Sequence, residues 1–414
     1  EDIGKFMIAF LNGEETLSGS MLSKQSIETM SEYRSSIHPL LPDTTYGFEA
    51  PTQLPLAGSS EHVLTKAGDL PGNSSLLLFI PEEQTGLFLT YNKMSTLRDV
   101  FYTQFMAAFF PEYTAPAEME SFEPFTAEEL ETFAGYYSDL RLSSIVSRIE
   151  VSEDGVLTIQ DAFLGPRTLR QVDDNLFVDD LTQRFTAFKW DENNDTFYMK
   201  EPYLNPLGYA RQGEESAGYT DVDESNVYQP FILALQSLGH FSNEAGAAFY
   251  PEQTMTRAEL TKHLVTTSGL KGSVSEQYAF SDIAEHPLAP YIQAAAELGI
   301  VYGDGDGTFN PDREVTRQEA AVMVWNVYSQ LYPQELFEQV RLSGETSEWA
   351  VPAVKMVVAL GLHGPEVDFT KDGEANFHSK ETMTRQEAAA FLHQLLLQPV
   401  DQIVSGLMAQ QQAG

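Results

Sequence analysis

Three short segments of the chain share residues whose types and spacing could bind an anion. They read TMTRAEL at 254–260, EVTRQEA at 314–320 and TMTRQEA at 382–388, and each opens a run of apolar residues at helical spacing. Thr followed three residues later by Glu is the pattern of a helix capping box, in which both side chains satisfy first-turn backbone amides. Capping explains the Thr and the Glu, but it does not require the Arg between them. The motif arginines are Arg257, Arg317 and Arg385.

Two interpretations of these arginines stay open. A helix N-terminus offers free backbone amides and a partial positive charge, which suit a carboxylate, and Arg adds a bidentate, charge-assisted pair. Alternatively, each Arg pairs with neighbouring acidic residues and holds the repeats together. A single Arg at the first helical position is usually a solvated surface residue, but three in register favour the ligand interpretation.

The composition limits the classes of function. The 414 residues carry a formal net charge of −37, which argues against nucleic acid or an anionic membrane face as a partner. There is no Cys, so disulfides and thiolate metal sites are excluded, and no apolar run reaches the length of a membrane span. The stretch DGDGTFNPDRE fails the spacing of a calcium loop, because counting from Asp304 puts Phe309 where glycine is required. We therefore predict no metal site and no cofactor.

The motifs belong to a repeated plan in the C-terminal half, where the motif arginines are 60 and 68 residues apart. Before the second motif, FSDI leads into an apolar helical run that ends at Gly299, and a loop rich in Gly and Asp follows. The first copy starts at YTDV, whereas the third lacks the aromatic-x-Asp opening and has an insertion in its loop. The predicted boundaries are three repeats at 217–272, 278–333 and 341–397, and a tail at 398–414.

The combination of FSDI, ELGIVYGDGDGTFNP and TRQE resembles the S-layer homology family over roughly residues 217–396. The resemblance implies an all-α three-fold prism of helices whose inter-repeat grooves bind anionic secondary cell-wall polysaccharide, which often carries pyruvate ketals. It also implies an extracellular location, at the cell wall or S-layer surface. The absence of Cys and the high acidity suit a secreted protein of a Gram-positive bacterium. By this match the binding residues are the three motif arginines, with Asp221, Asp282 and Gly303 as groove walls.

The N-terminal residues predict a helix and a small sheet. DIGKFMIAFLNG at 2–13 has apolar residues on one helical face and Gly13 as its stop. SLLLFI at 75–80 and LFLTYN at 87–92 follow a first strand and are separated by turns, which predicts an antiparallel meander.

Three segments of residues 1–112 follow one another in a recognisable order: LSKQSIETM, YGFE and GDLPGNSSLLLFIPEEQTGLFLTYN. In this order residues 1–112 resemble the C-terminal part of the serine β-lactamase and penicillin-binding-protein-like hydrolase family. Lys66-Ala67-Gly68 stands where that family carries its Lys-Thr-Gly or His-x-Gly strand. The resemblance implies that Lys66 faces the cleft and that the strand backbone, with Gly68, forms part of an oxyanion hole. The alternative for Lys66 is a solvated lysine on an edge strand.

The nucleophile of such a hydrolase is missing ahead of Lys66. No Ser-x-x-Lys or Tyr-x-Asn precedes it, so this chain is predicted to be inactive alone. The chain begins Glu-Asp-Ile without Met or a signal peptide. We therefore expect a preceding hydrolase segment that carries the nucleophile, or else a degenerate hydrolase.

Residues 113–125 are rich in Pro and Glu and are predicted to be a linker. Short alternating runs then fill 126–212, among them RIEVS, VLTIQ and RFTAFKWD, and predict a small antiparallel barrel or sandwich. Its start, FAGYYSDLR, resembles the accessory β-domain that follows such hydrolases. The predicted fold class is multidomain α+β: a partial serine-hydrolase α/β module, the β-domain and the all-α repeat prism.

Two functions follow from these predictions. The first is a surface-anchored serine hydrolase seen without its nucleophile segment. The second is a degenerate, non-catalytic S-layer-associated surface protein whose activity is wall-polymer binding. Both require that the repeats bind cell-wall polysaccharide.

Overall fold

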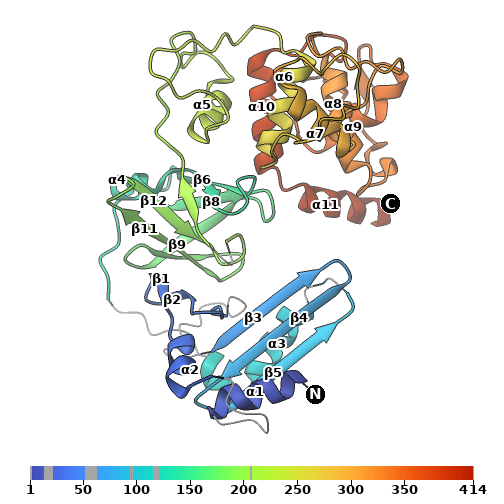
Figure 1. Ribbon diagram of the computed structural model, residues 1–414. Helices are drawn as coiled ribbons and strands as arrows, with labels where there is room; N and C mark the ends of the chain where they lie inside the picture. The colour runs from blue at the N-terminus through green and yellow to red at the C-terminus, as the bar shows by residue number, and fades with distance from the viewer. Residues whose placement is uncertain are drawn as a thin grey trace. The chain divides into compact units, whose positions relative to one another are not determined.

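The computed structural model describes residues 2–13, 22–51, 63–93, 95, 97–114, 121–205 and 208–413, and Figure 1 shows their helices and strands. Part of the predicted linker, residues 115–120, lies outside the described residues. The chain divides into two compact units. The first comprises Glu1–Phe133, Glu150–Thr158 and Arg167–Arg211, and the second comprises Ala134–Ile149, Ile159–Pro166 and Gln212–Gly414.

An antiparallel three-stranded sheet near the N-terminus confirms the predicted meander. Its strands are β3 (Leu64–Leu70), β4 (Asn73–Ile80) and β5 (Thr85–Tyr91), in the order β3-β4-β5. The central strand is apolar from Leu76 to Ile80, where both of its faces are covered. Leu76 and Leu78 pack with α3 (Leu97–Phe109), and Phe79 packs with the predicted helix α1 (Asp2–Asn12).

A hairpin ties the N-terminal residues to the β-domain within the first unit. After α2 (Lys24–Ser31), strands β1 (Ser35–His38) and β2 (Leu41–Thr44) pair with each other. Asp43 of β2 forms an ion pair of 2.5 Å with Lys200, and both side chains are almost fully buried. The Tyr209 hydroxyl also donates a hydrogen bond to Asp43. Nothing in the sequence indicated this pairing, because its partners lie far apart in the chain.

The β-domain is a closed barrel, which decides between the barrel and the sandwich expected from the sequence. Its strand order is β10-β11-β12-β13-β6-β7-β8-β9. Phe133, which follows the short helix α4 (Ala127–Leu130), lies with its ring centroid 4.8 Å from that of Phe188 in the first unit. The strands are β6 (Gly135–Asp139), β7 (Val146–Val151), β8 (Leu157–Asp161), β9 (Arg167–Asp173), β10 (Leu176–Asp179), β11 (Phe185–Asp191), β12 (Thr196–Lys200) and β13 (Ala210–Gln212).

Three pairs of helices make up the repeats of the second unit (Figure 1). The second helix of each repeat begins at a motif arginine, and the first helix of each repeat packs against the second helix of the preceding repeat: α7 on α6 and α9 on α8. The first helix of repeat one, α5, packs on α10 of repeat three, so the repeats close into a ring. The helices are α5 (Gln229–Ser237), α6 (Arg257–Thr267), α7 (Ala289–Glu297), α8 (Arg317–Tyr328), α9 (Val351–Ala359) and α10 (Arg385–Leu397).

A triangle of backbone hydrogen bonds closes this ring at the N-terminal ends of α6, α8 and α10. Met255 N–H donates to the Met383 carbonyl at 2.9 Å, Val315 N–H to the Met255 carbonyl at 3.0 Å, and Met383 N–H to the Val315 carbonyl at 2.9 Å. All three side chains are buried in one core. The three capping segments are thus held in matching positions, which gives the repeats an approximate three-fold symmetry.

The third repeat corrects the expectation of an all-α region. It contains a small sheet in the order β14-β16-β15, in which β14 (Leu342–Ser343) precedes α9, and β15 (Asp368–Phe369) and β16 (Ala375–Asn376) lie in the inserted loop. The residues predicted only as a tail form α11 (Val400–Ala413), which buries Val400 and Val404 in the repeat core. Short 3-10 turns complete the chain: η1 (Pro111–Thr114), η2 (Glu131–Phe133), η3 (Gln334–Phe337) and η4 (Glu348–Ala350). Across the described residues, no helix combines the length and apolar character that a membrane crossing requires.

Candidate ligand-binding junctions between the repeats

Each motif arginine begins a helix where that helix meets the loop of the next repeat in the ring. We call these places the Arg257, Arg317 and Arg385 junctions. The predicted capping boxes are confirmed at all three, because each Thr accepts from the N3 amide and each Glu accepts from the N-cap amide. The boxes fix where each helix starts and therefore where each Arg side chain leaves the backbone.

The expectation of free first-turn amides is wrong. The neighbouring loop already satisfies the amide of each motif arginine: Arg257 N–H donates to the Arg313 carbonyl at 2.8 Å, Arg317 N–H to Glu381 at 2.9 Å, and Arg385 N–H to Gln253 at 2.8 Å. The next amide along each helix is also taken by that loop, and the third donates to the capping Thr. An anion at these junctions must therefore be bound by side chains.

All three guanidinium nitrogens of Arg257 have partners within the chain. Its Nε donates to the Phe309 carbonyl at 3.0 Å and its Nη2 to the Tyr302 carbonyl at 3.2 Å. Its Nη1 lies 3.6 Å from a Glu319 carboxylate oxygen. The guanidinium also stacks on the Phe309 ring, 4.6 Å from its centroid. Arg257 is buried, so a ligand would have to displace an existing partner.

Arg317 forms a buried ion pair that pins the second repeat to the third. Its Nε and Nη2 bind the two carboxylate oxygens of Glu387 at 3.0 and 2.5 Å. Its Nη1 donates to Glu381 at 3.1 Å. Burial opposes the charge on Arg317, but the two carboxylates outweigh it and raise the pKa of the guanidinium. At this junction the interpretation that the Arg merely holds the repeats together is the better one.

Arg385 differs from the other two motif arginines. Its Nε donates to the Phe249 carbonyl at 2.8 Å, and its guanidinium stacks on the Phe249 ring at 4.8 Å. Within the described part of the chain, Nη1 and Nη2 have no hydrogen-bond or ion-pair partner. The side chain is half-buried. Arg385 is therefore held in place at one nitrogen and keeps two nitrogens for a ligand.

Two substitutions between the repeats explain this difference. At the position where the third repeat has Glu381, the first repeat has the neutral Gln253, so the acid that binds Arg317 has no counterpart near Arg385. The second is Tyr219, which stands where repeat two has Phe280.

The Tyr219 hydroxyl donates to the Ser242 carbonyl at 2.5 Å. In the second repeat the equivalent carbonyl is that of Tyr302, which accepts a hydrogen bond from Arg257. It is open to Arg257 because Phe280, the counterpart of Tyr219, has no hydroxyl that could bond it. Burial raises the pKa of Tyr219, and the nearby charge of Arg385 partly offsets the rise.

Aromatic rings surround Arg385. Phe249 is buried beneath its guanidinium, the Tyr219 ring lies 5.2 Å from that of Phe249, and Tyr250 is exposed next to it. Aromatic faces beside a free guanidinium can pack against apolar ring faces while the cation pairs with a carboxylate. Tyr219, Phe249 and Tyr250 were not among the predicted site residues, although Tyr219 begins the YTDV segment that opens the first repeat.

The predicted groove walls act inside the repeats. The two Asp282 oxygens accept from the amides of Phe309 and Asn310 at 2.9 and 2.7 Å, and Asp221 makes the same pair of bonds in the first repeat. These bonds hold the loop in a conformation in which Asn310 has a positive φ of 56°. Asp221 and Asp282 thus position the loops that carry the phenylalanines under the arginines.

Gly303 is required by close packing. A Cβ at this position would lie 2.5 Å from the Thr308 carbonyl oxygen and 2.8 Å from the Phe280 ring. Its role is therefore to let the loop pack, and its assignment to polysaccharide binding stays a prediction.

Lys66 and Gly68 lie on β3, an edge strand of the N-terminal sheet. Lys66 is exposed and forms an ion pair with Glu49, a residue that also bridges to β3 at Thr65. Gly68 is exposed, with the Ser75 hydroxyl 3.3 Å from where its Cβ would be. Their catalytic role stays a prediction.

The fold of the second unit is a ring of three capped helix pairs, and comparison with known families agrees with this. The S-layer homology domain model matches residues 218–261 and 279–321. These stretches fall in the first and second repeats, so the C-terminal part of the chain carries S-layer homology repeats. The third repeat has the same helix pair and capping box in the structure.

Several curated proteins are similar to part of the chain. The chain is 30% identical over 199 residues to an endoglucanase of Bacillus sp. (strain KSM-635), covering 46% of this chain and 20% of that protein. It is 27% identical over 180 residues to an uncharacterized cell wall amidase of Bacillus anthracis, covering 41% of this chain and 31% of that protein. It is 29% identical over 114 residues to S-layer protein EA1 of Bacillus anthracis, covering 27% of this chain and 13% of that protein. The chain therefore spans less than a third of the length of each of these relatives.

Solved structures are only distantly similar. A structure of SurE with D-Leu aligns at a TM-score of 0.32 and 14% identity, covering 46% of this chain and 44% of that one. An octameric penicillin-binding protein homologue from Pyrococcus abyssi aligns at 0.22 and 16% identity, covering 51% and 46%. Neither score indicates a shared fold.

Proposed function

We propose that the repeats attach this chain to the bacterial cell surface by binding an anionic cell-wall polysaccharide, and that the Arg385 junction is the principal site. The observation that carries the proposal is the guanidinium of Arg385, whose Nη1 and Nη2 have no partner among the described residues. The S-layer homology match and the similar cell wall amidase and S-layer protein support the cell surface as the location.

The chemistry of the junction suits a sugar that carries a carboxylate, such as a pyruvate ketal. A carboxylate can accept two charge-assisted hydrogen bonds from the two open nitrogens, while the sugar ring packs on Tyr250 or Tyr219. Because the chain has a net charge of −37, a polyanion is repelled at long range. Binding therefore depends on a local cation held in a fixed orientation, which Nε of Arg385 and the Phe249 ring provide.

The proposal is tested by co-sedimentation with purified cell-wall sacculi of a bacterium that carries such a polysaccharide. The chain is expected to sediment with intact sacculi and to stay in solution with sacculi stripped of their polysaccharide. Arg385→Gln should abolish sedimentation. The matched control Arg341→Gln removes the same charge from an exposed arginine of the third repeat and should sediment normally. Equal sedimentation of both variants would reject the Arg385 junction as the site.

The role of residues 1–112 is a second part of the proposal. The order of the sequence motifs and the β3-β4-β5 meander support the C-terminal part of a serine hydrolase of the β-lactamase and penicillin-binding-protein type. In this proposal the repeats anchor that hydrolase on a Gram-positive cell wall. The alternative is a non-catalytic surface protein. A fluorescent penicillin should not label this chain, because no Ser-x-x-Lys precedes Lys66. Covalent labelling would contradict the missing nucleophile.

A further inference from the structure

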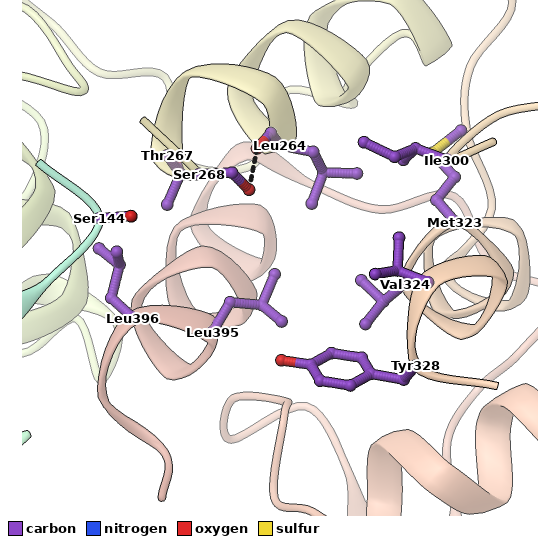
Figure 2. A pocket seen from close by; sticks show the side chains of 11 residues that line it. Ser144, Leu264, Thr267, Ser268, Ile300, Met323, Val324, Tyr328, Leu395 and Leu396 are labelled. Carbon is purple, nitrogen blue, oxygen red and sulfur yellow. Dashed lines mark hydrogen bonds between the residues drawn. The ribbon is translucent and has the colours of Figure 1, made fainter. Parts of the chain in front are cut away.

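A hollow of about 260 Å³ lies among α6, α8 and α10, at their C-terminal ends (Figure 2). It is separate from the Arg junctions, which lie at the N-terminal ends of the same helices. None of the described residues that line it is charged. Most of its wall is aliphatic: Leu264, Ile300, Met323, Val324, Leu395 and Leu396.

The hollow lies where α6 carries Ser268 and Thr267, of which Ser268 is smaller than its counterparts in both other helices and Thr267 is smaller than its counterpart in α10. Counting from the motif arginines, Thr267 occupies the position of Val327 in α8 and Leu395 in α10. Ser268 likewise occupies the position of Tyr328 and Leu396. Protein interiors are close-packed, so the smaller side chains in the last turn of α6, above all Ser268, leave a gap that the rest of the ring does not fill.

Thr267 lines this gap and carries a buried hydroxyl. The residue is 4% exposed, and its Oγ1 has no hydrogen-bond partner within the described chain. Its helical neighbours behave differently, because Thr266 and Ser268 donate to carbonyls of the preceding turn at 3.0 and 2.9 Å. A buried hydroxyl without a partner is unfavourable, and a hydrogen-bonding group inside the hollow would remove that cost.

A second hydroxyl comes from α8. In Figure 2 the Tyr328 side chain reaches along the hollow toward Leu395, with its hydroxyl at the leading end. The other polar residues of the wall are Ser144 and Ser268, and the rest of the wall is apolar. This pattern, an apolar cavity with a few polar groups that fix orientation, is typical of small-molecule sites.

We infer that this hollow binds a small, uncharged aromatic molecule with one hydroxyl group. The size follows from the volume, because a cavity of about 150 Å³ accepts benzene and this one has room for two fused rings. The absence of charge follows from the wall, which has no group that could pair with a buried ion. The hydroxyl of the ligand would bond Thr267. The inference does not depend on polysaccharide binding.

The test uses 2-naphthol and naphthalene as probes of the full chain, with binding measured by calorimetry and by NMR shifts of the methyl groups around the hollow. Both probes should bind. Thr267→Val keeps the shape of the side chain but removes the hydroxyl, so 2-naphthol should bind about fivefold more weakly. Naphthalene, which makes no hydrogen bond, should bind Thr267→Val as it binds the original chain.

A filling variant completes the test. Thr267→Leu supplies the side chain that α10 has at this position, so it should block both probes while the circular dichroism spectrum is retained. If neither probe binds the original chain, the hollow is a packing gap only and the inference is overturned. It is also overturned if Thr267→Val weakens both probes equally, because the hydroxyl would then have no role in recognition.

Discussion

Replacing Arg317 by Ala should destabilise the repeats far more than replacing Arg385. Glu387 is 5% exposed, and its two oxygens face Nε and Nη2 of Arg317 at 3.0 and 2.5 Å. Without Arg317, this carboxylate keeps only the capping bonds at Thr384 and stays buried without a counter-charge. Breaking a buried ion pair from one side costs about 3–5 kcal/mol. The Arg385→Ala variant loses one hydrogen bond to a carbonyl and one contact with an aromatic ring, which together should lower the free energy of unfolding by about 1–2 kcal/mol.

Thermal unfolding of the full chain measures this difference. For a unit of this size each kcal/mol lowers the Tm by about 2–4 °C, so Arg317→Ala should lower the transition of the repeats by about 10 °C. The fluorescence of Trp325 and Trp349 reports that transition, since both lie in the repeats. The double variant Arg317→Met with Glu387→Met removes both charges and should recover most of the loss. Equal Tm losses for Arg317→Ala and Arg385→Ala would refute the assignment of different roles.

Three further predictions follow from individual contacts. Burial lowers the pKa of His393 to about 4. As the pH falls from 6.5 toward 4, the imidazole is protonated in the unfolded state before it is protonated in the folded state, so the free energy of unfolding should decrease by on the order of 3 kcal/mol. His393→Gln should flatten this loss in acid denaturation curves. Asp282→Ala frees two loop amides and should cost about 2 kcal/mol in urea unfolding, yet leave sedimentation with sacculi unchanged at temperatures where it stays folded. Tyr219→Phe frees the Ser242 carbonyl for Arg385 and should weaken polysaccharide binding severalfold in calorimetry, whereas unchanged affinity would reject the comparison of the junctions.

Features with local signals could be predicted from the sequence. The capping boxes depend on Thr and Glu three residues apart, and the meander depends on apolar strands separated by turns. The helix α11 also has such a signal, because Val400, Ile403, Val404 and Leu407 follow helical spacing. The prediction of a mere tail at 398–414 overlooks this pattern, which is sufficient to predict a helix that packs on the core.

Features that depend on pairing between distant segments could not be predicted. The first-turn amides of α6, α8 and α10 are filled by carbonyls of the next repeat, and this requires that α5 closes the ring on α10. The same holds for the choice among the three arginines. Gln253 and Tyr219 are visible in the sequence, but their meaning appears only when the junction places them beside Arg385 rather than Arg257.

The dissociation constant for a soluble fragment of the acidic wall polysaccharide tests the central claim most directly. Calorimetry should show binding to the original chain and to Arg341→Gln, about tenfold weaker binding or more to Arg385→Gln, and no binding when the carboxyl groups of the polysaccharide are reduced. If Arg385→Gln binds the fragment as tightly as the original chain does, the open guanidinium at this junction is not the group that holds the polysaccharide, and the account is wrong.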